Sequence, residues 1–156
     1  MERHDKLRKR LVTSHQAVLS VIETLDGVTA AELSANDGWS GKDLLAHLAA
    51  SELGHCHVIR QLVADRPTLI ADFDLDTFNN AEVAKRRRRS WEATIAEYRA
   101  NRAATLALLD TITEADWEKA GPHPGGFDTT VEGVFRVIAI HEKRHLRDLN
   151  NALKKQ

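Results

Sequence analysis

The stretch "VEGVFRVIAIHEKRHLRDLNNAL" (131–153) has the pattern of an amphipathic helix, and this pattern decides the fold class. Its apolar side chains recur every three or four residues, as on the buried face of an α-helix. They are Val131, Val134, Phe135, Ile138, Leu146, Leu149 and Leu153. His141 and His145 lie along one edge of that face, one turn apart, so both imidazoles can reach a single point. The stretch therefore predicts a long helix with two histidines beside its buried face.

Three more segments have a helical pattern. Apolar spacing predicts one helix over roughly 5–25 and another over roughly 80–109. Between them, "WSGKD" predicts a helix start, with Ser40 as the N-cap and Asp43 in the capping-box position. Pro67 predicts the end of that helix. No segment alternates apolar and polar residues as a strand does. The chain is therefore predicted to be all-α, with four helices packed as a bundle.

Two linkers in the chain resemble each other. "LDGVTAAEL" (25–33) follows the first predicted helix, and "LDTITEADW" (109–117) follows the third. This repeat predicts two related helical hairpins, with residues 68–78 forming the crossover between the second and third helices. Thr129 and Glu132 fit a capping box at the start of the last helix.

Length and composition narrow the function classes. The chain has 156 residues, enough for a single domain over 1–156. Its net charge of −1 gives no global attraction to nucleic acid or to an anionic membrane. No apolar run approaches the roughly 18 residues of a membrane span, and from the charged first residues we expect no signal peptide. The single Cys56 cannot form an internal disulfide. We expect a cytoplasmic protein with no nucleic-acid or membrane partner, and we interpret "KRRRR" (85–89) as a solvated, salt-bridged surface.

The segment "HEKRH" (141–145) matches the H-E-x-x-H pattern of zinc proteases. That function is disfavoured because such proteases grip a peptide along a strand edge, and no strand is predicted. His47, on the edge of another predicted helix, is the better third partner for His141 and His145. Three neutral imidazoles leave coordination positions open, as in catalytic sites, and suit zinc, nickel, cobalt, copper or iron.

Three segments together resemble the DinB/YfiT-like superfamily of four-helix-bundle metalloenzymes. They are "GWSGKDLLAHLA" (38–49), "FDLDTFNNAEV" (73–83) and "IHEKRHLRDL" (140–149), in the same order and with similar spacing as in the family. The resemblance implies that His47, His141 and His145 bind a divalent metal, with zinc or nickel the leading candidates. It also implies a homodimer.

The same resemblance implies a class of activity. Relatives include transferases and isomerases that use mycothiol, bacillithiol or glutathione, as well as hydrolases. We therefore expect an enzyme that acts on a small molecule by metal-activated thiol or water, with a low-molecular-weight thiol as a possible cofactor. The alternative is a non-catalytic metal- or ligand-binding module of the stress response.

Several other residues are candidates for this site. Glu142 falls inside the apolar face and is the candidate catalytic base; the alternative is a salt bridge within the bundle. The candidate substrate-lining residues are His55, Asn79, Tyr98 and Arg102. For His55 the alternative is a core hydrogen bond, and for Arg102 it is a structural ion pair. His15 and His123 belong to no pattern that predicts a role.

Overall fold

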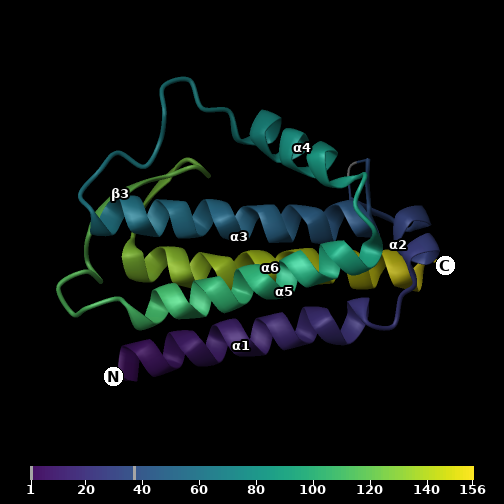
Figure 1. Cartoon of the computed structure of the whole chain (residues 1–156), viewed down its shortest axis with the longest axis horizontal. Helices are drawn as coiled ribbons and strands as arrows, with labels where there is room; N and C mark the ends of the chain where they lie inside the picture. Colours follow the sequence, from purple (N-terminus) through teal and green to yellow (C-terminus); the bar gives the residue numbers. More distant parts are fainter. Residues whose placement is uncertain (1, 37) are drawn as a thin grey trace.

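The computed structural model describes residues 2–36 and 38–156 and has an all-α fold (Figure 1). Its helices are α1 (Glu2–Ile22), α2 (Gly27–Glu32), α3 (Gly41–Val63), α4 (Leu75–Arg86), α5 (Trp91–Asp110) and α6 (Val131–Lys154). The strands are β1 (Ser34–Asn36), β2 (Trp39–Ser40), β3 (Ala120–His123) and β4 (Phe127–Thr130). None of the helices in these ranges combines the length and apolar character that crossing a bilayer requires.

The four long helices α1, α3, α5 and α6 form the bundle (Figure 1). Both α3 and α1 pack against α5 and α6. The predicted fold class is therefore confirmed. The short helix α4 lies outside the bundle and packs on α3.

The predicted capping box at the start of α3 is present. The Ser40 hydroxyl accepts a hydrogen bond from the Asp43 backbone N–H at 3.0 Å, and the Ser40 N–H donates to the Asp43 carboxylate at 3.2 Å. The cap of α6 is one residue later than predicted. Thr130, rather than Thr129, is the N-cap, and its hydroxyl accepts from Gly133 N–H at 3.0 Å.

The prediction of one helix over residues 80–109 was wrong, because the chain turns between α4 and α5. Ser90 caps α5 by accepting a hydrogen bond from the Ala93 N–H at 3.0 Å. The next residue, Trp91, is buried, and its indole N–H donates to the Leu25 carbonyl at 3.1 Å. A cap followed by an anchored tryptophan redirects the chain from the outer surface of α3 into the bundle.

The absence of strands was also wrongly predicted. β1 pairs with β2, and β3 pairs with β4, both antiparallel. Both hairpins are too short to show a period-two pattern in the sequence. One hairpin precedes α3 and the other precedes α6, so a long helix, a turn segment, a hairpin and a capped helix occur in the same order twice. This order supports the predicted repeat.

The apolar core has two parts, separated by a polar layer. One cluster contains Val18, Ile22, Leu44, Leu48 and Leu149, among others, and the second contains Leu7, Leu11, Ile59, Val131 and Phe135, among others. Between them lie the buried side chains of Ser14, Glu52, Arg102 and Glu142, together with the hydroxyl of Tyr98, whose ring belongs to the first cluster. In each long helix the polar residue lies between residues of the two clusters, so the layer crosses the middle of the bundle.

Ion pairs and hydrogen bonds join this polar layer. Arg102 on α5 donates to the Glu52 carboxylate on α3 at 2.5 and 3.0 Å, and its Nη2 lies 2.8 Å from Oε1 of Glu142 on α6. The Ser14 hydroxyl on α1 donates to Oε1 of Glu142 at 2.6 Å, and the Tyr98 hydroxyl donates to Oε2. We call these five residues the ion network. It contacts all four long helices.

We expect Arg102→Met to destabilise the protein by about 3–5 kcal/mol, because it leaves two buried carboxylates without their cation. Glu142→Gln keeps the Arg102–Glu52 pair and should cost less, about 1–3 kcal/mol. Urea unfolding followed by circular dichroism measures both. Arg99→Met is the matched control, because Arg99 on the same helix pairs with Glu23 at the exposed surface; its expected cost is below about 1 kcal/mol. Equal costs for the two arginine variants would contradict the role given to the ion network.

Candidate metal centre

His47, His141 and His145 come together beside the polar layer. His47 comes from α3, and the other two come from α6. One nitrogen from each ring can be chosen so that all three lie within 4.8 Å of one another. The Nε2 atom of His141 lies 3.1 Å from Nε2 of His47 and 3.0 Å from Nε2 of His145. Three imidazoles that share a tetrahedral ion at 2.0–2.1 Å have nitrogens about 3.3 Å apart. The spacing therefore fits one shared metal ion.

The surroundings of His145 also favour its use as a metal ligand. Its Nδ1 lies 3.3 Å from Oδ2 of Asp148, although the geometry does not make a hydrogen bond. Asn36 holds that carboxylate by a hydrogen bond of 3.2 Å. A carboxylate beside Nδ1 favours the tautomer with the proton on Nδ1. The Nε2 lone pair of His145 is then free to point into the cluster.

The pKa values of the three rings also suit a metal ligand. Burial, with a smaller contribution from His145, lowers the pKa of His47 to about 3. Burial and the two other rings lower the pKa of His141 to about 2. Burial also lowers the pKa of His145, although Asp148 opposes this shift. All three rings are thus neutral at pH 7, and protons do not compete for their lone pairs.

No carboxylate or thiolate joins this cluster among the residues that the structure describes. The carboxylate of Glu52, on the same helix as His47, is held by Arg102. Asp148 faces Nδ1 of His145, away from the side where the Nε2 atoms meet. A metal held by these histidines would keep at least one position for an outside molecule, which is the layout of catalytic sites.

Three of the predicted site residues lie in the ion network. Glu142 contacts Tyr98, Arg102 and Ser14, and Arg102 also pairs with Glu52. Burial raises the pKa of Glu142, but the His15 ring, Arg102 and the two hydroxyls outweigh it, so this pKa lies below its usual value. Both carboxylate oxygens are engaged, as in the structural alternative. The catalytic role of Glu142 and the substrate-lining roles of Tyr98 and Arg102 stay predictions.

The other two substrate-lining candidates lie on α3 and α4. The ring centre of His55 is 6.0 Å from that of His141, so His55 borders the cluster without joining it, and its substrate-lining role stays a prediction. Asn79 is half-buried on α4, and its role stays a prediction.

The sequence did not indicate several neighbours of the cluster. The Trp39 ring packs 4.7 Å from that of His47, and the Ser51 hydroxyl is 3.5 Å from His47 Nδ1. His123, in β3, lies 5.2 Å from His55 between ring centres. Ser51 could have been found from its i+4 spacing to His47 on one helix. Nothing local in the sequence places His123 there, because its position depends on how the β3–β4 hairpin packs.

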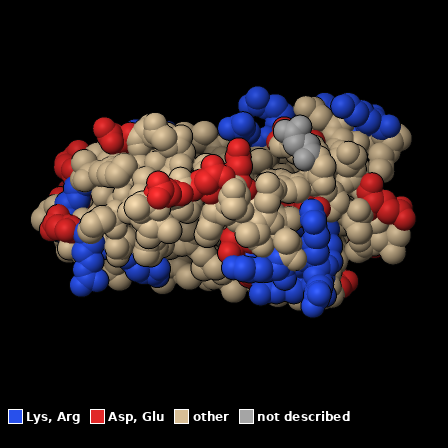
Figure 2. All heavy atoms as spheres, turned by 90° about the horizontal axis from the view of Figure 1, so that it is seen from above, with Lys and Arg blue, Asp and Glu red and all other residues tan. Residues whose placement is uncertain are grey.

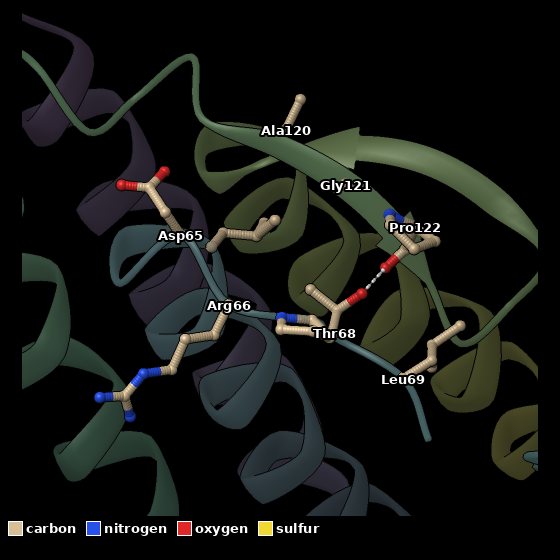
Figure 3. Close-up of a pocket in the computed structure, with 9 residues that line it drawn as sticks. Asp65, Arg66, Thr68, Leu69, Ala120, Gly121 and Pro122 are labelled. Carbon is tan, nitrogen blue, oxygen red and sulfur yellow. Dashed lines mark hydrogen bonds between the residues drawn. The ribbon is translucent and has the colours of Figure 1, made fainter. Parts of the chain in front are cut away.

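A hollow of about 460 Å³ lies away from the histidines, between residues 65–69 and 120–122 (Figure 3). Its charged lining residues, Asp65 and Arg66, are exposed. The buried hydroxyl of Thr68 already donates to the Pro122 carbonyl at 2.6 Å. None of its lining residues belongs to the histidine cluster. We therefore place the functional site at the histidines rather than at this hollow.

The basic run 85–89 is salt-bridged, as the sequence suggested. Arg86 pairs with Glu82 and Glu97 at 2.8 Å, and Arg87 pairs with Asp43 at 3.2 Å. Lys and Arg side chains gather over the half of the molecule where α4 ends, with acidic side chains nearby (Figure 2). These pairs reduce the positive charge that the run presents to a partner.

The chain is similar to proteins of one family. A model of the DinB superfamily matches residues 10–149. None of the curated proteins matches the sequence. A mycothiol-dependent maleylpyruvate isomerase is 17% identical with a TM-score of 0.77, over 95% of this chain. The match spans only 59% of the length of that isomerase.

Two other solved structures have the same fold over most of their length. YfiT from Bacillus subtilis, described as a probable metal-dependent hydrolase with an unusual four-helix bundle topology, is 18% identical with a TM-score of 0.79. The match covers 99% of this chain and 88% of YfiT. The colibactin self-resistance protein ClbS, crystallised with double-stranded DNA, is 15% identical with a TM-score of 0.77, over 97% of this chain and 95% of ClbS. At these identities the likeness shows the fold alone, and the absence of nucleic-acid binding stays a prediction for this chain.

We expect the metal-free protein to lose stability as the pH falls from 7 to 5. The folded-state pKa values of His47 and His141 are about 3 and about 2, whereas those of the unfolded chain are about 6.5. Below pH 6.5 the unfolded chain therefore binds protons that the folded chain does not, and the free energy of unfolding falls by up to about 1.4 kcal/mol per pH unit for each such group.

The measurement is urea unfolding at several pH values after chelation. His141→Gln should reduce the slope of stability against pH, because it removes one group whose pKa changes on folding. An unchanged slope in this variant would show that His141 is not buried in the neutral form.

Proposed function

Because this chain belongs to the DinB superfamily, we propose that it is a divalent-metal-dependent enzyme that acts on a small molecule through an activated thiol or water. The observation that carries the proposal is the convergence of His47, His141 and His145. A divalent metal held by three neutral imidazoles keeps its charge uncompensated and acidifies a thiol or water that binds next to it.

The protein's own residues have separate tasks in this proposal. The three histidines hold the metal, and the carboxylate of Asp148 orients His145 by favouring the proton on its Nδ1. Trp39 packs against His47 and shields one side of the cluster. Glu142 positions α6 through the ion network, and we keep its role as a base as a prediction.

Two observations bear on the choice between a thiol and a water. The mycothiol-dependent isomerase with the same fold uses a thiol, whereas YfiT is described as a hydrolase. Cys56 does not supply a thiolate from the chain itself, because burial raises the pKa of its thiol. If the reaction uses a thiol, that thiol therefore comes from outside the chain. We propose zinc or nickel as the metal, since imidazole suits both.

We expect protein purified without chelators to contain about one divalent metal ion per chain by mass spectrometry. His141→Ala should lower this content at least tenfold, because it removes the central nitrogen of the three. His57→Ala is the matched control, because His57 lies exposed on α3 and outside the cluster. A metal-free native protein, or one in which His141→Ala keeps its metal, would overturn the proposal.

Turnover distinguishes the enzyme from the non-catalytic binding module. The metal-loaded protein is incubated with glutathione, bacillithiol or mycothiol and a fluorogenic electrophile, and separately with chromogenic esters and amides. An enzyme should turn over either the thiol and electrophile pairs or the esters and amides. This turnover should require the metal and should be lost in His141→Ala. Bound metal with no turnover in any set favours the binding module.

A further inference from the structure

A second pair of histidines lies next to the metal centre. The ring centre of His55 is 6.0 Å from that of His141 and 5.2 Å from that of His123. The three rings form a row that leads from the metal centre to the β3–β4 hairpin. His55 and His123 are outside the set of atoms that converge on one ion.

The hydrogen bonds of His123 fix its tautomer. Its Nδ1 accepts a hydrogen bond from the Gly125 N–H at 2.9 Å, so the proton of the neutral ring is on Nε2. Burial lowers the pKa of His123, which favours the neutral ring. The residue is only 7% exposed, and its Nε2 has no hydrogen-bond partner among the residues that the structure describes. A buried donor without a partner costs about 1–3 kcal/mol, a cost that a bound acceptor would remove.

His55 has the complementary character. Burial, followed by the nearby His123, lowers the pKa of His55 to about 3, so its ring is neutral at pH 7. A neutral imidazole has one nitrogen with a free lone pair in either tautomer, so His55 offers one acceptor. The pair offers one donor and one acceptor side by side.

This combination favours one kind of ligand atom. A second metal is disfavoured, because the nitrogen of His123 that faces away from Gly125 carries a proton. A carboxylate needs two donors, and the His55 lone pair would repel it. A hydroxyl group matches both histidines, since its oxygen accepts from His123 and its proton is donated to His55.

We propose that His55 and His123 form a subsite that binds a hydroxyl group of the small molecule acted on at the metal centre. This inference rests on the proposed function for the identity of the molecule, but the subsite itself can be tested without metal. The Phe127 ring, stacked 4.4 Å from His123 at 14°, holds the His123 ring in place. In this proposal His123 contributes to the choice of ligand and does not hold the metal.

The test compares two thiols of nearly equal size, 3-mercapto-1-propanol and 1-butanethiol, on cobalt-loaded protein. Charge-transfer absorption between sulfur and cobalt reports their affinities. We expect the hydroxyl-bearing thiol to bind about tenfold more tightly, the value of one hydrogen bond to a buried donor. His123→Asn should abolish the preference and leave the affinity for 1-butanethiol and the metal content unchanged, because Asn can still accept from Gly125 but cannot reach as far as Nε2.

His57→Asn is the control and should keep the preference. Equal affinities for the two thiols in the wild type, or a preference that survives His123→Asn, would overturn the subsite. Tighter binding of 3-mercaptopropionate that depends on His123 would also overturn it, in favour of an anion site.

A second measurement does not depend on the metal. In metal-free protein with ¹⁵N-labelled histidine, titration with 1,3-propanediol should shift the His123 Nε2 resonance to saturation, and 1-butanol should shift it less. No such shift overturns the subsite even if the metal centre stands. A shift in a protein that binds neither cobalt nor thiol supports the subsite and overturns the proposed function alone.

Discussion

The buried guanidinium of Arg102 is the constraint on which the arrangement of the bundle depends. A cation in an apolar interior is tolerated only where carboxylates surround it. Arg102 has Glu52 from α3 on one side and Glu142 from α6 on the other. Neither helix can slide or rotate against α5 without leaving a charge among apolar side chains. The Ser14 hydroxyl, which donates to Glu142, extends the same restriction to α1.

This constraint also sets the direction of the metal-binding histidines. Glu142 follows His141 directly, and successive residues of a helix differ in direction by about 100°. When Glu142 points at Arg102, His141 and His145 must point to the neighbouring side of α6, where α3 packs. His47 reaches the same place from α3, about 1.4 turns before Glu52. The ion network thus acts on the cluster through the orientation of the helices.

The parts of the structure that follow from local spacing could be predicted from the sequence. The i, i+4 pair His141 and His145 and the Ser40 cap depend on residues within one helical turn. His47 could be added because it lies on the edge of an apolar stripe. The turn at Ser90 was missed, because the apolar spacing continues across it and only the tertiary anchor of Trp91 reveals the change of direction. The inward positions of Arg102 and Glu142 were recognised, but their pairing needed the three-dimensional packing.

The helices and the hairpin contribute to the site in different ways. The three metal-binding candidates are on helices that the ion network holds, so a change there alters the core of the bundle. His123 is on a hairpin whose turn depends on local bonds, with Gly126 at a φ of 87° and its N–H donating to the His123 carbonyl at 3.0 Å. Segments of this kind accept sequence change more readily than a packed core does. A bundle built this way can keep one metal position while the hairpin changes which molecule binds beside it, and for that reason the reaction is harder to infer from the fold than the metal site.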